Sequence, residues 1–190
     1  MTSPPTRLLC IDLQVDALPE HSPDAKSVFG ARQLLALGRR LGWTIVHARS
    51  RTQPVIRARD GSPNAGLNPL MSEKVFFHDG RSVAESPGLA SLLHEWRNET
   101  VFVAAFDHVA LLSCLLACYE PGPRLVLVED VISLKSVGDA SAVDAFHGTA
   151  WRLAFGATTI GGIISEASRR SGISLAQPDH ALHRPGNLQA

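Results

Sequence analysis

The sequence lacks the features that mark several specialised classes of protein. It has three cysteines in 190 residues, an odd and small number that fits a reducing cytoplasm better than a disulfide framework. Lys and Arg total 18 and Asp and Glu total 18, so no net charge steers the chain to nucleic acid or to an acidic membrane. The longest apolar stretch, 101–119, contains Asp107 and His108, and the N-terminus lacks the pattern of a signal peptide. We therefore expect a cytoplasmic protein that neither crosses a membrane nor binds nucleic acid.

Short apolar runs alternate along the chain with segments of helical apolar spacing. The expected strands are 8–11, 43–47, 74–77, 100–105, 124–129 and 157–160, and the expected helices are 25–41, 87–96, 109–119, 141–155 and 162–170. Strands that are apolar throughout and separated by helices indicate a parallel sheet covered on both faces. We predict an α/β fold, a three-layer α/β/α sandwich with an open, mainly parallel sheet of about six strands. Residues 49–72 are expected to form a long loop, residues 1–173 one domain, and residues 174–190 an irregular tail.

Polar residues that directly follow the predicted strands are the candidates for a functional site, because open α/β sheets bind ligands beyond the carboxyl ends of their strands. These residues are Asp12, His47, His78 and the pair Asp107 and His108. Asp12 is the strongest candidate, since a carboxylate at the end of a buried strand is partly desolvated and can act as a proton donor or base. A purely structural role for Asp12, in which its side chain caps a neighbouring loop, fits the sequence equally well.

Familiar catalytic and metal-binding motifs are missing. The sequence has no Gly-x-Ser-x-Gly elbow, no Walker A pattern and no His-Glu-x-x-His motif. Cys114 and Cys118 lie one helical turn apart, but in an apolar helix, which favours buried core thiols over a metal site. His47 has no second histidine near it before His78, so we expect no bound metal and no other cofactor.

Five segments of the sequence follow one another in a recognisable order. They are LLCIDLQVD at 8–16, GWTIVH at 42–47, FHDGRSV at 77–83 with Leu89, AAFDHVA at 104–110, and the stretch 122–130 with its Gly-x-Arg, strand and Glu-Asp. In this order, over residues 7–170, they resemble the isochorismatase-like (cysteine hydrolase) superfamily. The resemblance implies the α/β fold predicted above and a homo-oligomeric assembly.

The family uses a triad of Asp, Lys and Cys, and the resemblance places only one of the three in this chain. Asp12 falls on the aspartate position. The lysine position falls on His78, or on Lys74 if the alignment is shifted. The cysteine position falls on Ala110, or on Leu111 with a change of register by one residue, and neither side chain can be a nucleophile. Cys114 would reach this position only if its helix began later than expected.

Some isochorismatases have a small residue in place of the cysteine and hydrolyse a vinyl ether by protonation from the aspartate. Ala110, after His108 and Val109, resembles that arrangement. The resemblance therefore implies a hydrolase that acts without a covalent intermediate on a small carbonyl, amide or enol-ether compound. Asp12 would be the general acid or base and His78 its electrostatic partner.

The substrate would be bound by the remaining residues that the resemblance gathers. Arg81 would hold a substrate carboxylate, and backbone N–H groups of the 106–109 turn would bind the developing oxyanion. The other expected contacts are Gln14, His47, Asp107, His108 and Ala110. The alternative is a catalytically inactive member of the family that binds a small molecule or a partner subunit.

Overall fold

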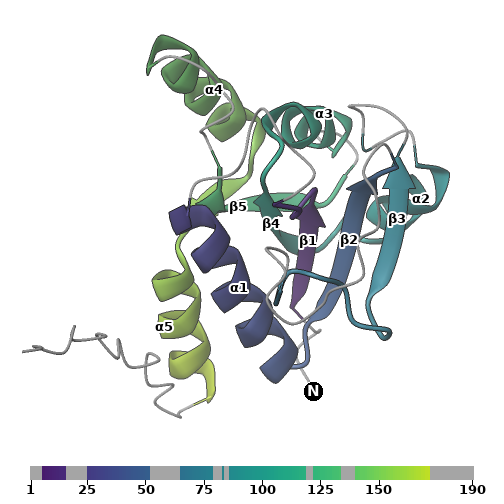
Figure 1. The fold of residues 1–190 in the computed structure, drawn as a ribbon, viewed down its shortest axis with the longest axis vertical. Helices are drawn as coiled ribbons and strands as arrows, with labels where there is room; N and C mark the ends of the chain where they lie inside the picture. Colours follow the sequence, from purple (N-terminus) through teal and green to yellow (C-terminus); the bar gives the residue numbers. More distant parts are fainter. Residues whose placement is uncertain are drawn as a thin grey trace, which may run out of the picture. The chain divides into compact units, whose positions relative to one another are not determined.

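The computed structural model of the chain describes residues 6–15, 25–51, 65–78, 83, 86–118, 122–133 and 140–171 (Figure 1). The chain divides into two compact units, Met1–Ile160 and Gly161–Ala190. The first unit contains the sheet and four of the described helices, and the described part of the second, 161–171, is the helix α5 (Ile160–Ser171) without its first residue. The predicted tail, 174–190, lies outside the described residues, so the predicted end of the domain at residue 173 stays a prediction.

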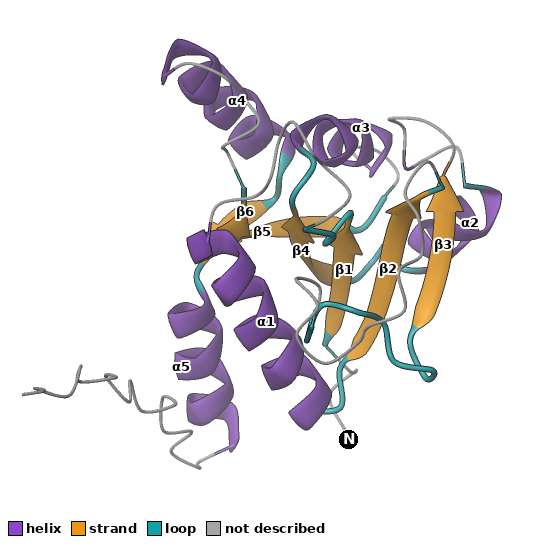
Figure 2. Cartoon of the chain, viewed as in Figure 1, coloured by secondary structure: helices purple, strands orange, loops and turns teal. Residues whose placement is uncertain are grey.

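The sheet has six strands, all paired in parallel (Figure 2). The strands are β1 (Arg7–Ile11), β2 (Thr44–Ser50), β3 (Lys74–His78), β4 (Thr100–Ala105), β5 (Arg124–Ile132) and β6 (Gly156–Thr158). Their order across the sheet is β3-β2-β1-β4-β5-β6. The α/β fold with an open parallel sheet of six strands is therefore confirmed.

The helices of the first unit cover both faces of this sheet. They are α1 (Ala25–Arg40), α2 (Pro87–Glu95), α3 (His108–Cys118) and α4 (Ala140–Leu153). The chain moves across the sheet in one direction from β1 to β2 and in the other from β3 to β4, β5 and β6. Because such connections are right-handed, α1 lies on one face and α2, α3 and α4 lie on the other. The core cluster on the second face joins buried residues of these three helices.

Alternation along the strands decides which face each side chain meets. Val46 and Ala48 of β2 belong to the core cluster under α2 and α3. Ile45 points the other way, and its side chain lies against Gly38 of α1, where an added Cβ would approach Ile45 at 3.3 Å. His47 has the same parity as Ile45 and therefore belongs to the α1 face.

Three strands, β2, β3 and β5, extend beyond their predicted ends, β3 by the single residue His78. β2 continues through Arg49 and Ser50, which pair with Phe77 and His78 of β3. β5 continues to Ile132, with a register shift against β4 between Val103 and Ala105. Polar residues at a strand end give no apolar signal, so only the pairing partner reveals that the strand goes on.

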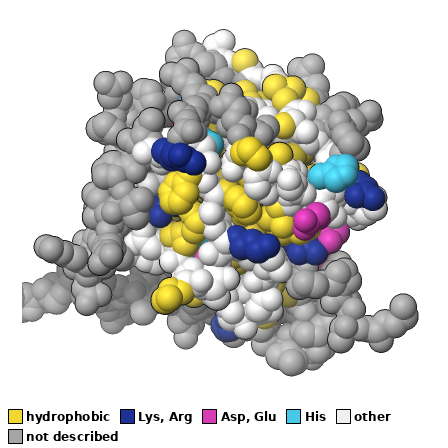
Figure 3. All heavy atoms as spheres, turned by 90° about the vertical axis from the view of Figure 1, so that its right-hand side faces the viewer, with side chains coloured by type: hydrophobic (Ala, Val, Ile, Leu, Met, Phe, Trp, Pro, Cys, Tyr) yellow, Lys and Arg dark blue, Asp and Glu magenta, His cyan; other side chains and the backbone are white. Residues whose placement is uncertain are grey.

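One edge of the sheet is formed by β3, on the side that faces the viewer in Figure 3, where hydrophobic side chains lie among charged ones. Phe77 is 38% exposed there, and Lys74 is exposed at the start of the strand. A charged side chain on an edge strand discourages pairing with another chain. Among the described helices, none combines the length and the apolar character that crossing a bilayer requires.

Candidate active site at the carboxyl ends of the strands

The strand order places a topological switch point at β1, because the chain runs from β1 to β2 on one side while β4 lies on the other. Asp12 comes directly after β1 and has a left-handed backbone, with φ of 47°. Its N–H donates to Ala48 O at 2.9 Å, and Gln14 N–H donates to Asp12 O at 2.7 Å. This tight turn ends the strand and holds Asp12 at the edge of the sheet where ligands are expected.

Asp12 contacts two neighbouring strands through its carboxylate. Oδ1 accepts a hydrogen bond from the backbone N–H of Ser50 at 2.7 Å. Oδ2 lies 3.2 Å from His78 Nε2, and both side chains are almost fully buried. The distance is that of an ion pair, although the two groups are not aligned as a hydrogen bond. The structure thus brings together the two residues that the sequence analysis named as catalytic, and it adds a backbone donor that leaves no signal in the residue types.

The same geometry shows which of the two candidates on β3, Lys74 or His78, approaches Asp12. Lys74 is exposed at the far end of β3. Four residues of strand separate it from His78, which corresponds to about 13 Å. His78, and not Lys74, is therefore the residue of β3 that meets Asp12.

The N-terminus of α3 lies beyond the end of β4 and is capped by Asp107. Asp107 Oδ1 accepts hydrogen bonds from Val109 N–H at 2.8 Å and from Ala110 N–H at 2.9 Å. Phe106 N–H donates to Ile11 O at 3.2 Å. The N–H groups of Phe106 and Val109, expected to bind an oxyanion, therefore already have acceptors. Asp107 is a helix cap in this structure, a role that its position before an apolar helix could have suggested.

The start of α3 provides no nucleophile in either register. Ala110 is 1% exposed and Leu111 is fully buried, and both pack in the core under the helix. Cys114 is equally buried, and its pKa is raised by a hydrogen bond with Cys118 and by burial. Burial also raises the pKa of the Cys10 thiol, inside β1. The reading in which Cys114 acts as the nucleophile is therefore not favoured by the structure.

Three further residues were expected to contact the substrate: Gln14, His108 and Arg81. Gln14 is 2% exposed, and among the described residues none donates a hydrogen bond to its Oε1. Buried polar atoms normally have a partner, so this oxygen is suited to a ligand donor or an ordered water. His108 is the first residue of α3 and is half-buried. Arg81 lies outside the described residues, and its role stays a prediction.

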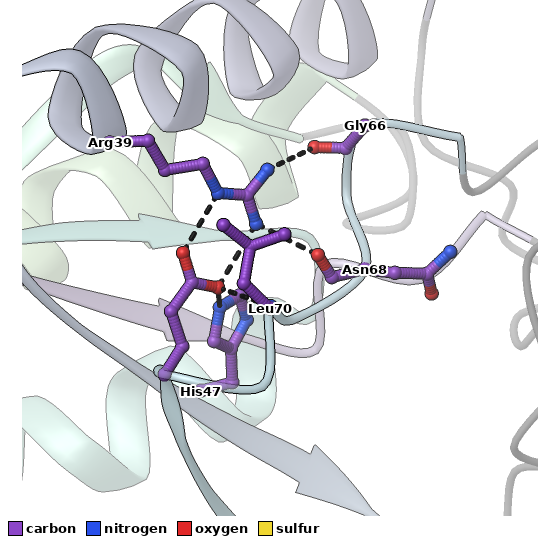
Figure 4. Close-up of polar contacts among 6 residues, drawn as sticks. Arg39, His47, Gly66, Asn68 and Leu70 are labelled. Carbon is purple, nitrogen blue, oxygen red and sulfur yellow. Dashed lines mark hydrogen bonds and ion pairs between the residues drawn. The ribbon is translucent and has the colours of Figure 1, made fainter.

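His47 contacts a different carboxylate from the one that His78 meets, and its expected role as a substrate contact stays a prediction. It lies on the α1 face, and its Nε2 is 2.9 Å from Glu73 Oε2 (Figure 4). Arg39 of α1 donates from Nε to Glu73 Oε1 at 2.8 Å. We call these three residues the Arg39–Glu73–His47 clasp. The parity of His47 within β2 turns its side chain away from Asp12, and a single sequence does not show which parity faces the site.

The clasp links the described residues before β3, 65–73, to α1 and β2. Arg39 also donates to Gly66 O at 3.2 Å and to Asn68 O at 2.8 Å. Burial raises the pKa of Glu73, but hydrogen bonds from His47, Arg39 and the Leu70 N–H outweigh it and lower the pKa to about 2. Burial lowers the pKa of His47 despite the neighbouring carboxylate. A carboxylate only accepts, so His47 donates to Glu73 from Nε2.

Within the described part of the chain, no group of three or more His, Cys, Asp or Glu side chains is arranged to hold a metal ion. Asp12 and His78 form a pair with two members, and the clasp contains an arginine. What the site offers chemically is a carboxylate that can move a proton, an imidazole beside it, and two oxygen acceptors at Gln14 and Asp107.

No protein-family model matches the chain, and no curated protein matches it in sequence. Several solved structures do match its fold. The MAR1 ribonuclease of Caenorhabditis elegans superposes with a TM-score of 0.65 at 16% identity, over 97% of each chain. A putative isochorismatase hydrolase of Oleispira antarctica gives 0.65 at 18% identity, over 87% of this chain and 99% of that one. The N-carbamoylsarcosine amidase of Thermoplasma acidophilum gives 0.58 at 19% identity, over 82% of this chain and 95% of that one. The chain therefore has the fold of the isochorismatase-family hydrolases.

Proposed function

We propose that the protein is a hydrolase of the isochorismatase-like kind that acts on a small carbonyl, amide or enol-ether compound without a covalent intermediate. The observation that carries this proposal is the contact of 3.2 Å between Asp12 Oδ2 and His78 Nε2 at the switch point of the sheet. A buried acid beside an imidazole is suited to proton transfer. We propose further that the protein acts in the cytoplasm as a homo-oligomer.

Asp12 would move the proton of the reaction. With an enol ether it would donate a proton to the vinyl carbon, water would add to the resulting oxocarbenium ion and return a proton to Asp12, and the hemiketal would then break its C–O bond to release an alcohol and a carbonyl compound. With an amide or ester it would take a proton from the water that attacks the carbonyl carbon and give it to the leaving amine or alcohol as the C–N or C–O bond breaks. The Ser50 N–H, which donates to Oδ1 at 2.7 Å, holds the carboxylate in one orientation during either step.

His78 would set the charge around Asp12. A protonated imidazole at this distance would stabilise negative charge on the carboxylate. A lysine would supply this charge over a wider range of pH.

The solved neighbours support hydrolysis but do not select a substrate. One is named as a ribonuclease, one as a putative isochorismatase hydrolase and one as an amidase. Fold alone does not fix a reaction, so the substrate class is argued from the site.

A second candidate is a catalytically inactive protein that binds a small molecule or a partner subunit. It is favoured by the start of α3, where Ala110 and Leu111 offer no nucleophile and Asp107 occupies the N–H groups of Val109 and Ala110. In this case the site would bind a ligand without catalysing a reaction.

The test is a panel of small amides, esters and enol ethers incubated with the purified protein and with Asp12→Asn. If the proposal holds, at least one compound is hydrolysed, and kcat/KM falls about 10³-fold in Asp12→Asn because the general acid or base is lost. His78→Ala lowers the rate less, and His78→Lys restores part of it and shifts the pH profile upward.

His94→Ala is the matched control, because His94 is an exposed histidine at the end of α2. It should leave turnover unchanged. Turnover that survives Asp12→Asn would contradict the proposed mechanism. Binding without any turnover across the panel would favour the inactive candidate.

A further inference from the structure

We propose that Asp107 determines which ligand the site accepts. The part of the ligand that lies against the N-terminus of α3 is a hydrogen-bond donor with positive or zero charge, as in an amidine, amine or urea. This inference rests on the proposed function only for the location of the ligand, at the carboxyl end of the sheet.

The first step concerns the helix terminus itself. Helix N-termini attract anions, because their N–H groups are unpaired and the helix dipole places partial positive charge there. In α3 this place is taken by a side chain of the protein, since Asp107 Oδ1 accepts the N–H groups of Val109 and Ala110. An anionic ligand would find both donors occupied and a carboxylate beside them. A donor or a cation would find a charged acceptor.

The second step concerns Gln14, which follows the end of the neighbouring strand β1. β1 and β4 pair directly, with Ile11 opposite Ala105, so Gln14 and Asp107 follow the ends of adjacent strands. Gln14 is 2% exposed, and no described residue donates to its Oε1. A buried oxygen without a donor is the complement of a ligand N–H or O–H group. Gln14 and Asp107 would therefore both favour a ligand group that donates hydrogen bonds.

The test uses three probes of nearly equal shape and different charge: benzamidine, benzamide and benzoate. Their affinities for the full chain are measured by calorimetry or by NMR titration. Benzamidine should bind more tightly than benzoate. Asp107→Asn retains a capping oxygen but removes the charge, so the ratio of the two affinities should fall by about tenfold, with benzamide changed least.

Asp130→Asn is the matched control, since Asp130 Oδ2 accepts the N–H of Ile160 at 2.7 Å and is also a capping carboxylate. It should leave the ratio unchanged. A thermal melt verifies that Asp107→Asn is folded, and Asp107→Ser, which also caps, replaces it if it is not. The inference is overturned by an unchanged ratio in Asp107→Asn, by tighter binding of benzoate to the wild type, or by no binding of any probe. The experiment measures binding, so a failure to find turnover would contradict the proposed function and leave the inference about Asp107 standing. Turnover by a protein that does not bind benzamidine more tightly than benzoate would contradict the inference about Asp107 and leave the proposed function standing.

Discussion

The molecule contains two buried pairs of a carboxylate and an imidazole, on opposite faces of one sheet, and they are built differently. In the Arg39–Glu73–His47 clasp, the two oxygens of Glu73 receive hydrogen bonds from Arg39, His47 and the Leu70 N–H. At the candidate site, Asp12 has one backbone donor and a histidine that approaches without hydrogen-bond alignment. Asp12 also has a left-handed backbone, whereas no residue of the clasp has a positive φ.

The difference separates a structural role from a functional one. A buried polar network whose members are all bonded holds a fold in one arrangement. A residue with a strained backbone, or with a buried polar atom that lacks a hydrogen bond, makes the free energy of folding less favourable. Such residues are found most often at functional sites. Gln14, with a buried oxygen that no described residue bonds, belongs with Asp12 in the second group. Mutation should therefore affect mainly stability on the α1 face and mainly function at the carboxyl ends of the strands.

The largest expected effect on stability comes from Glu73→Ala. This change leaves Arg39 and His47 without their shared carboxylate, and breaking a buried ion pair from one side is strongly destabilising. Because the Arg39 side chain is partly exposed, we expect a loss of about 3 kcal/mol, at the lower end for such pairs. Urea denaturation measures it.

Glu95→Ala provides the comparison for this change, because Glu95 is an exposed glutamate at the end of α2. It should change the free energy of unfolding by less than about 0.5 kcal/mol. The probe affinities of folded Glu73→Ala protein should stay close to those of the wild type. A stability loss no larger than that of Glu95→Ala would remove the contrast between the two regions.

A smaller effect is expected from the pH dependence of the clasp. The pKa of His47 is lowered from 6.5 in the fold, and that of Glu73 is lowered from 4.5 to about 2. In both cases the unfolded chain takes up protons first as pH falls, so stability is lost below pH 6.5 through His47 and between about pH 4.5 and 2 through Glu73. His47→Gln should flatten the stability curve just below pH 6.5, measured by urea denaturation at a series of pH values.

The exposed His94 offers the control for this experiment as well. His94→Gln should give the same curve as the wild type. The prediction is wrong if the stability of the wild type does not change with pH below 6.5, or if the stability of His47→Gln falls there as steeply as that of the wild type. Either result would mean that protonation of His47 does not lower the stability of the fold.

The smallest expected effect concerns a thiol placed at the start of α3. Ala110→Cys would be buried beside the Asp107 carboxylate, which disfavours the thiolate, so it should alkylate as slowly as Cys114. Adding Asp107→Ser keeps a capping oxygen and removes the charge, and should raise the alkylation rate about tenfold. The alkylation of the introduced thiol and of Cys114 is measured by peptide mapping with mass spectrometry after treatment with iodoacetamide. Fast alkylation of Ala110→Cys alone would show that Asp107 does not control the charge at this end.

Much of the fold could be predicted from the sequence, because its strands are apolar on both faces and its helices show regular spacing. The pairing of Asp12 with His78 could also be predicted, since parallel strands bring their carboxyl ends to one edge. The face of His47 could not, because a run such as Trp43-Thr44-Ile45-Val46-His47 is apolar on both sides and hides its parity. Neither could the clasp, in which Arg39 and Glu73 are 34 residues apart and belong to no motif.

The backbone of Asp12 has a consequence for any attempt to improve this protein. A left-handed φ in a residue other than glycine disfavours folding by about 1 kcal/mol, and glycine adopts it without that penalty. A search that rewards thermal resistance alone would therefore be drawn to Asp12→Gly early. It would gain robustness by discarding the carboxylate on which the proposed chemistry depends. Selections for heat tolerance in this chain need a simultaneous requirement for activity or ligand binding, or they will erode the site first.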